Sequence, residues 1–260
     1  MFDPIALFRR RLAQGQVLAG AGIYLTDPQA SEALADSFDF LWFDMEHSPM
    51  SMEALRAHLM VVRGKGKPAI VRVAGSDTPF IKQVVDAGAH GIVVPQIRSA
   101  GEVKRIVDDC RYPPVGRRGF GPLVPTNYGR SGGPHYIETA NAQLFVSVMI
   151  ETAEAAEAID QITAIPGLDS VVLGPWDLSG SLGVLGEVGH PKVVAALEKV
   201  IASAKRAGLS VGSGMPADAE FAALQVRRGV QWLQMGGDCG YLVAWAEQMV
   251  GQLRHRLAAS

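Results

Sequence analysis

The chain contains 260 residues, of which 48% are hydrophobic and 19% are charged, and its formal net charge at pH 7 is -2. These proportions supply enough apolar side chains for a sizeable core and exclude a disordered chain. Lysine and arginine are not in excess, so the sequence lacks a phosphate-neutralising surface, and nucleic acid is not an expected partner.

The first residues, MFDPIALFRRRLAQG, place basic side chains after a short apolar patch instead of before a long one, unlike a secretory signal. No stretch approaches 18 uninterrupted apolar residues, so no membrane-spanning helix is predicted. Cys110 and Cys239 occur without a CxxC pair or a disulfide framework and are expected to be free thiols. We therefore expect a soluble, cytoplasmic protein.

Short apolar runs alternate with amphipathic helical patterns eight times along the chain. The runs are near-continuously apolar, which suits parallel strands covered by helices. The expected strands span residues 17–25, 40–46, 68–74, 91–97, 144–151, 170–175, 210–215 and 232–237. Eight such units predict one α/β domain over residues 1–260, folded as a (β/α)8 TIM barrel; a doubly wound open sheet is the alternative.

One segment interrupts this alternation. Residues 111–142 are rich in glycine and proline and are too long for an ordinary connection. The functional interpretation is a lid or a subunit contact organised around Arg117 and Arg118, and the alternative is a surface insertion.

Reactive side chains gather at the carboxyl ends of the predicted strands, where a parallel barrel carries its active site. They are Asp44, Glu46 and His47 after the second strand, Arg72 on the third, Glu151 after the fifth and Asp177 after the sixth. We therefore expect all six in one mouth.

Glu151 and Asp177 are separated by 26 residues, the length of one βαβ repeat, so they are expected on neighbouring strands at matching heights. Two such carboxylates share either a proton or a cation. No histidine or cysteine lies beside them in a zinc-like pattern, so an all-oxygen site for Mg²⁺ or Mn²⁺ is favoured. The alternative is that each caps the helix that follows it.

His47 differs from the other five histidines because it ends a strand beside two acids, where a carboxylate can tune an imidazole as a base. No lysine projects from a predicted strand, which disfavours Schiff-base chemistry, and no GxSxG elbow is present. Glycines 212, 214, 236 and 237 fall on the last two strands, where they serve tight turns or, less favoured, a phosphate site.

The motifs FDMEHSPMS, VRVAGSDTPFIKQVVDAGAHGIVVPQI, RYPPVGRRGFGP, MIETAEA and GPWDLSGSLG together resemble the HpcH/HpaI aldolase family, over about residues 17–250. The resemblance implies a (β/α)8 barrel that cleaves 4-hydroxy-2-oxo acids reversibly to pyruvate and an aldehyde through a metal-stabilised enolate. It also implies a homohexamer, a dimer of trimers, whose C-terminal helix packs on a neighbouring subunit.

By this resemblance the metal, Mg²⁺, Mn²⁺ or Co²⁺, is bound by Glu151 and Asp177, and Arg72 acts on the keto oxygen. His47 is the base, acting through a metal-bound water, and is oriented by Asp86. The substrate carboxylate is bound by backbone N–H groups of Gly174 and Trp176. Asp44 and Glu46 hold the water ligands of the metal.

Two departures from the family pattern bear on the substrate. MIET replaces the QIET of some members, which puts the apolar Met149 in the pocket, and the GPLVPTNYGR stretch of the long loop varies among members. Two alternative functions remain. One is a lyase of the citrate lyase β-subunit type acting on a CoA ester, and the other is a barrel that binds a ligand without catalysis.

Overall fold

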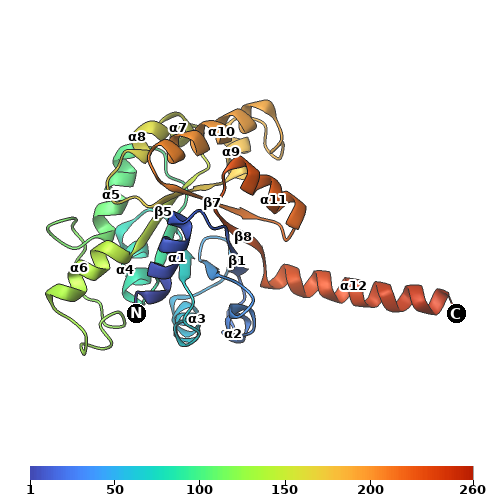
Figure 1. Ribbon diagram of the computed structural model, residues 1–260, viewed down its shortest axis with the longest axis horizontal. Coiled ribbons are helices and arrows are strands. Elements are labelled where there is room, and N and C mark those ends of the chain that lie inside the picture. The colour runs from blue at the N-terminus through green and yellow to red at the C-terminus, as the bar shows by residue number, and fades with distance from the viewer. Residues whose placement is uncertain (260) are drawn as a thin grey trace.

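The computed structural model describes residues 1–259 and contains eight parallel strands closed into a barrel inside a ring of helices (Figure 1). Each strand pairs with the next, and β8 pairs with β1 to complete the barrel. The strands are β1 (Leu18–Ile23), β2 (Phe40–Asp44), β3 (Ala69–Arg72), β4 (Gly91–Val94), β5 (Phe145–Ile150), β6 (Ser170–Leu173), β7 (Ser210–Met215) and β8 (Trp232–Gly237). The (β/α)8 prediction is confirmed, and the open sheet is excluded.

The helices cover the outside of the barrel because each buries one apolar stripe. In α3 (Met52–Gly64), Ser51 caps the first turn by accepting a hydrogen bond from Ala54 N at 3.1 Å, and Leu55, Leu59 and Val62 turn toward the strands. The other helices are α1 (Asp3–Ala13), α2 (Gln29–Ala35), α4 (Thr78–Asp86), α5 (Ala100–Cys110), α6 (Pro134–Gln143), α7 (Ala153–Glu157), α8 (Ile159–Thr163), α9 (Pro175–Ser181), α10 (Pro191–Arg206), α11 (Ala219–Arg228) and α12 (Asp238–Ala258).

Helix α1, which the sequence did not predict, closes the amino end of the barrel. Its Phe8 ring packs edge-on against Phe40 and Phe145, each with ring centroids 5.4 Å apart, and also reaches Trp232. The strands make room for these rings with glycine: a Cβ at Gly212 would lie 2.3 Å from Trp232. Because aromatic side chains fill this end, the opposite end provides the open mouth.

The strand-end glycines therefore have packing roles. Gly212 and Gly214 lie within β7, where a Cβ would meet side chains of β8. Gly237 leaves space for the ring of Tyr24, and Gly236 has a φ of +70° that favours glycine. Of the four glycines expected to serve tight turns, only Gly236 has the backbone conformation of a turn. Both cysteines are free, as expected.

Residues 111–142 form a packed segment that ends in a helix, not a loop throughout. The prediction missed α6, which begins at Pro134. Arg111 is buried and donates to the carbonyl oxygens of Leu144 and Gly167, each at 2.9 Å. Arg118 is 3% exposed and lies 4.4 Å from the ring centroid of Tyr112. Buried arginines thus fasten the segment to the barrel.

Helix α12 extends away from the barrel as a single long helix (Figure 1). Most of its large apolar side chains are exposed, among them Leu242, Val243, Trp245, Met249, Val250 and Leu253. Such an apolar surface on an isolated helix indicates a contact with another molecule. Among residues 1–259, none of the helices combines the length and apolarity required to cross a membrane.

His90 is buried at the amino end of β4 in its neutral form. Its Nε2 donates to the carbonyl oxygen of Met1 at 2.9 Å, and its Nδ1 accepts from Ala69 N at 3.1 Å. Burial lowers the pKa of His90 to about 4. Protonation of His90 would add a proton to Nδ1, the atom that accepts the hydrogen bond from Ala69 N, and would break that bond.

We therefore expect the free energy of unfolding to fall as the pH is lowered, because the folded state resists protonation of His90. The pKa of His90 in the folded state lies below the unfolded value of about 6.5. The stability that depends on neutral His90 is therefore fully present above pH 6.5 and is lost as the pH falls toward 4, a change of about 3 kcal/mol in the free energy of unfolding. Urea unfolding of the wild type and His90→Asn at several pH values tests this. The variant should lack that part of the pH dependence, and identical profiles would contradict the prediction.

Candidate active site

Arg72 and Asp44 form an ion pair at the mouth. Asp44 ends β2, Arg72 ends β3, and the strand register makes them direct neighbours. Asp44 is fully buried and accepts hydrogen bonds from Arg72 Nε at 3.1 Å and from Arg72 Nη2. A two-pronged contact of this kind holds the guanidinium plane in one orientation. Arg72 Nη1 then faces Glu46 Oε2 at 3.1 Å and the sulfur of Met149 at 3.9 Å.

Asp44 also builds the turn that follows β2. Its Oδ1 accepts from the backbone N–H of Glu46 at 2.9 Å and of His47 at 3.1 Å, and Ser48 Oγ donates to its carbonyl oxygen. Both carboxylate oxygens are thus engaged by protein donors. Asp44 thereby orients Arg72 and the turn that carries Glu46 and His47, and its expected place around metal-bound water stays a prediction.

Glu151 is held at the end of β5. It is 1% exposed, and its Oε1 accepts a hydrogen bond from Gln96 N at 2.6 Å. Gln96 has a φ of +57°, an unusual value for a non-glycine residue, and so directs its N–H at the carboxylate. Gly174 lies on the other side, where a Cβ would be 2.8 Å from Glu151 Oε2. Sequence reasoning missed Gln96, whose role depends on a contact across strands.

Like charges surround Glu151. Its pKa is raised to about 7, mainly by burial and also by the neighbouring carboxylates of Glu46 and Asp177, while the hydrogen bond from Gln96 and the charge of Arg72 act to lower it. The pKa of Glu46 is also raised, first by burial and then by Asp44 and Asp177, while Arg72 and His47 act to lower it. Carboxylates crowded in this way are the environment that a divalent cation stabilises.

Asp177 lies in the first turn of α9, directly after β6, and is exposed to the mouth. The N–H of Gly174 donates to Ile150 O at 3.2 Å, so Gly174 is not available as a substrate donor and that expectation is wrong. Pro175 has no N–H, which leaves Trp176 as the donor expected from this turn.

His47 lies at the mouth, after β2, but Asp86, the residue expected to orient it, does not lie beside it. Its imidazole is 61% exposed, and its Nε2 lies 3.4 Å from Glu46 Oε2. Asp86 is the last residue of α4, which runs from the mouth toward the opposite end, and it pairs with buried Arg118 at 2.5 Å. Within one chain, Asp86 therefore does not orient His47.

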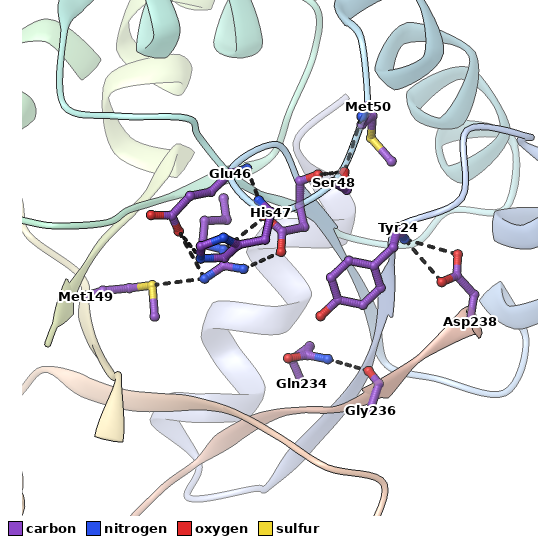
Figure 2. Close-up of polar contacts among 11 residues, drawn as sticks. Tyr24, Glu46, His47, Ser48, Met50, Met149, Gln234, Gly236 and Asp238 are labelled. Atoms are coloured by element: carbon purple, nitrogen blue, oxygen red, sulfur yellow. Dashed lines mark hydrogen bonds and ion pairs between the residues drawn. The ribbon is translucent and has the colours of Figure 1, made fainter. Parts of the chain in front are cut away.

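Figure 2 shows the opposite wall of the mouth, which the sequence did not predict. Tyr24 follows β1, and its backbone N–H donates to Asp238 at 3.1 and 3.2 Å. Gln234 of β8 donates from its side chain to the carbonyl oxygen of Gly236. These residues carry no recognisable motif. The mouth thus has a charged wall around Arg72 and a neutral polar wall around Tyr24.

The charged wall suits a divalent cation. Among residues 1–259, no three His, Cys, Asp or Glu side chains are arranged to surround a metal ion. Glu151 and Asp177 are the two carboxylates here that could hold such an ion, with water or substrate oxygens needed to complete the coordination that is usual for Mg²⁺. The raised pKa of Glu151 reflects its burial beside two other carboxylates, an environment that a bound cation would relieve.

Comparison with known proteins places the chain in a known family. Residues 26–244 match the family model described as HpcH/HpaI aldolase/citrate lyase. The chain belongs to the HpcH/HpaI aldolase/citrate lyase family. It is 34% identical to a hydroxypyruvate/pyruvate aldolase of Roseovarius nubinhibens, covering 96% of this chain and 98% of the relative.

Other members of the HpcH/HpaI family resemble the chain over similar lengths. A 4-hydroxy-2-oxovalerate aldolase of Rhodococcus jostii is 35% identical over 92% of each chain. A solved HpcH/HpaI aldolase/citrate lyase family protein of Burkholderia cenocepacia has a TM-score of 0.88 at 31% identity, covering 95% of this chain and 99% of that one.

The citrate lyase branch is more distant. A citrate lyase β subunit of M. tuberculosis is 15% identical with a TM-score of 0.56 over 86% of this chain, a likeness that shows the fold alone. A CoA site would be expected to bring free basic residues to the mouth, but two arginines of the 111–142 segment are engaged within the chain: Arg118 pairs with Asp86, and Arg117 pairs with Asp109 at 2.7 Å. No observation favours the CoA-ester alternative.

Breaking the central ion pair should destabilise the protein. Asp44→Asn leaves the guanidinium of Arg72 buried with only Glu46 as a charged neighbour, so we expect a loss of about 3 kcal/mol in the free energy of unfolding. Asp36→Asn, which breaks the exposed pair with Lys65, is the control and should cost less than about 1 kcal/mol. Urea unfolding measures both; equal effects would show that the buried pair contributes little.

Proposed function

We propose that the protein is a metal-dependent aldolase that cleaves a 4-hydroxy-2-oxo acid reversibly to pyruvate and an aldehyde. The observation that carries the proposal is the partly buried, oriented Arg72 facing a group of carboxylates at the open end of the barrel. A guanidinium and a divalent cation together match the paired oxygens of a 2-oxo acid. The names of the relatives support the same reaction class.

Glu151 and Asp177 would hold the cation, which we propose to be Mg²⁺, Mn²⁺ or Co²⁺. When bound, it would supply Lewis-acid polarisation of the 2-oxo acid. Glu46, whose pKa is raised by burial, lies between this pair and Arg72 and would accept hydrogen bonds from water in the mouth.

Arg72 would stabilise the negative charge that develops on the keto oxygen as the C3–C4 bond breaks. Asp44 orients the guanidinium before the substrate arrives, so little reorganisation accompanies the reaction. The backbone N–H of Trp176 would donate to the substrate carboxylate. Met149 lies against the guanidinium and gives this side of the pocket an apolar surface.

His47 would move the proton. In cleavage it takes the proton from the C4 hydroxyl, the C3–C4 electron pair passes to the pyruvate half, and the aldehyde leaves. In condensation the same imidazole returns the proton to the aldehyde oxygen. Its exposure at the mouth and its contact with Glu46 suit this role.

Asp86 would act on His47 only across a subunit boundary, because the two lie toward opposite ends of one barrel. Helix α12, with its exposed apolar side chains, supports an assembly of subunits. We propose the hexamer, a dimer of trimers, with α12 packed on a neighbouring subunit.

Loss of either proposed ligand should abolish catalysis. Glu151→Gln and Asp177→Asn should each lower metal-dependent cleavage more than about 100-fold, because each removes one of two protein donors. Deuterium exchange into the pyruvate methyl group should fall in parallel. Glu154→Gln, which alters an exposed carboxylate paired with Arg98, is the control and should retain activity. Full activity in excess EDTA would contradict the proposal.

Complementation tests the proposed contact between subunits. His47→Ala and Asp86→Asn should each be nearly inactive alone, but co-expressed chains should regain activity. A site then combines His47 of one subunit with Asp86 of another, so about a quarter of randomly mixed sites are intact. No recovery in mixed assemblies, shown to contain both chains by mass spectrometry, would contradict an action of Asp86 across the boundary.

A further inference from the structure

Tyr24 is fixed at the mouth by a buried carboxylate. Asp238 is 4% exposed and accepts hydrogen bonds from the backbone N–H groups of Tyr24, Leu25 at 3.0 Å and Cys239 at 2.8 Å. This cluster joins the end of β1 to the start of α12. The backbone that carries Tyr24 is therefore held in place before any ligand enters.

The Tyr24 ring lies in space left by two glycines. A Cβ at Gly22 would be 2.8 Å from Tyr24 Cε2, and a Cβ at Gly237 would be 2.3 Å from the same atom. The ring thus rests on the backbones of β1 and β8, and Figure 2 shows it directed into the mouth, on the side opposite Glu46 and Met149. Any side chain larger than hydrogen at these glycines would displace it.

The Tyr24 hydroxyl is a free donor. Among residues 1–259 it makes no hydrogen bond, whereas the hydroxyl of Tyr241 donates to the carbonyl oxygen of Met235. Burial raises the pKa of Tyr24, and the charges of Asp44 and Arg72 also act on it, which places the ring near the charged wall. The hydroxyl stays protonated at neutral pH.

The two walls divide the reactants. The pyruvate half of the proposed reaction is engaged by Arg72, the last residue of β3, and by Glu151 and Asp177, which follow β5 and β6. His47 handles the aldehyde oxygen and follows β2, the strand paired with β1. The proposed reaction therefore assigns the aldehyde half to the side of the mouth formed by β1 and β2, which carry Tyr24 and His47 at their ends.

We propose that the Tyr24 hydroxyl selects the aldehyde by donating a hydrogen bond to an oxygen substituent next to the reacting carbonyl. This rests on the proposed aldolase function and assigns its aldehyde class: 2-hydroxyaldehydes over apolar aldehydes of the same length. Because the Tyr24 hydroxyl has no hydrogen-bond partner in the protein, it favours an aldehyde whose hydroxyl oxygen can accept its hydrogen bond.

Glycolaldehyde and propionaldehyde test the proposal, because they differ by a hydroxyl in place of a methyl group. Condensation with pyruvate is measured as kcat/KM for each aldehyde in the intact, metal-loaded enzyme. Tyr24→Phe should reduce the glycolaldehyde to propionaldehyde ratio about tenfold, mainly through loss of glycolaldehyde turnover. Tyr241→Phe removes a hydroxyl that is already bonded and should leave the ratio at the wild-type value.

Deuterium exchange into pyruvate separates this proposal from the function on which it rests. Absence of metal-dependent exchange in the wild type overturns the aldolase function and the Tyr24 proposal with it. Exchange in the wild type together with an unchanged aldehyde ratio in Tyr24→Phe overturns only the Tyr24 proposal. An equal loss with both aldehydes does the same, since it indicates that the ring supports the mouth without selecting the aldehyde.

Discussion

The ion pair between Arg72 and Asp44 is the constraint on which the rest of the mouth depends. A cation and an anion at the ends of adjacent parallel strands are held in register by the sheet, so their contact forms as the barrel closes. Asp44 then uses the same carboxylate to shape the turn that carries Glu46 and His47. One buried acid thereby aligns the guanidinium, a second acid and the imidazole, and the cost of burying its charge is offset by several donors.

Barrel closure explains why these groups face a single opening. Helix α1 and the aromatic cluster around Phe8 fill the amino end, and glycines in the strands admit the large rings. The carboxyl end remains open, with charged groups on one side and Tyr24 on the other. The asymmetry of the two walls follows from strand order. The charged residues follow β2, β3, β5 and β6, whereas Tyr24 and Gln234 come from β1 and β8, which pair with each other.

The strand pattern could be read from the sequence because parallel strands buried on both faces leave continuous apolar runs, and all eight occur within a few residues of their expected positions. Helix α6 was missed because glycine and proline dominate the residues before it. The use of Gly174 N–H was missed because it depends on the pairing of β5 with β6. Asp86 lies where the sequence places it, at a helix end, but the direction of that helix carries it away from His47.

The sequence by itself determined the barrel, the family motifs and which polar side chains stand at the strand ends, since periodicity and strand ends are local properties. The tertiary structure alone decided which groups meet. Three contacts join segments that are 28 to 214 residues apart in the sequence. They are the ion pair of Asp44 with Arg72, the hydrogen bond from Gln96 to Glu151 and the hydrogen bonds from Tyr24 to Asp238. Such contacts arise from strand register and barrel closure, and neither is written in a local stretch of sequence.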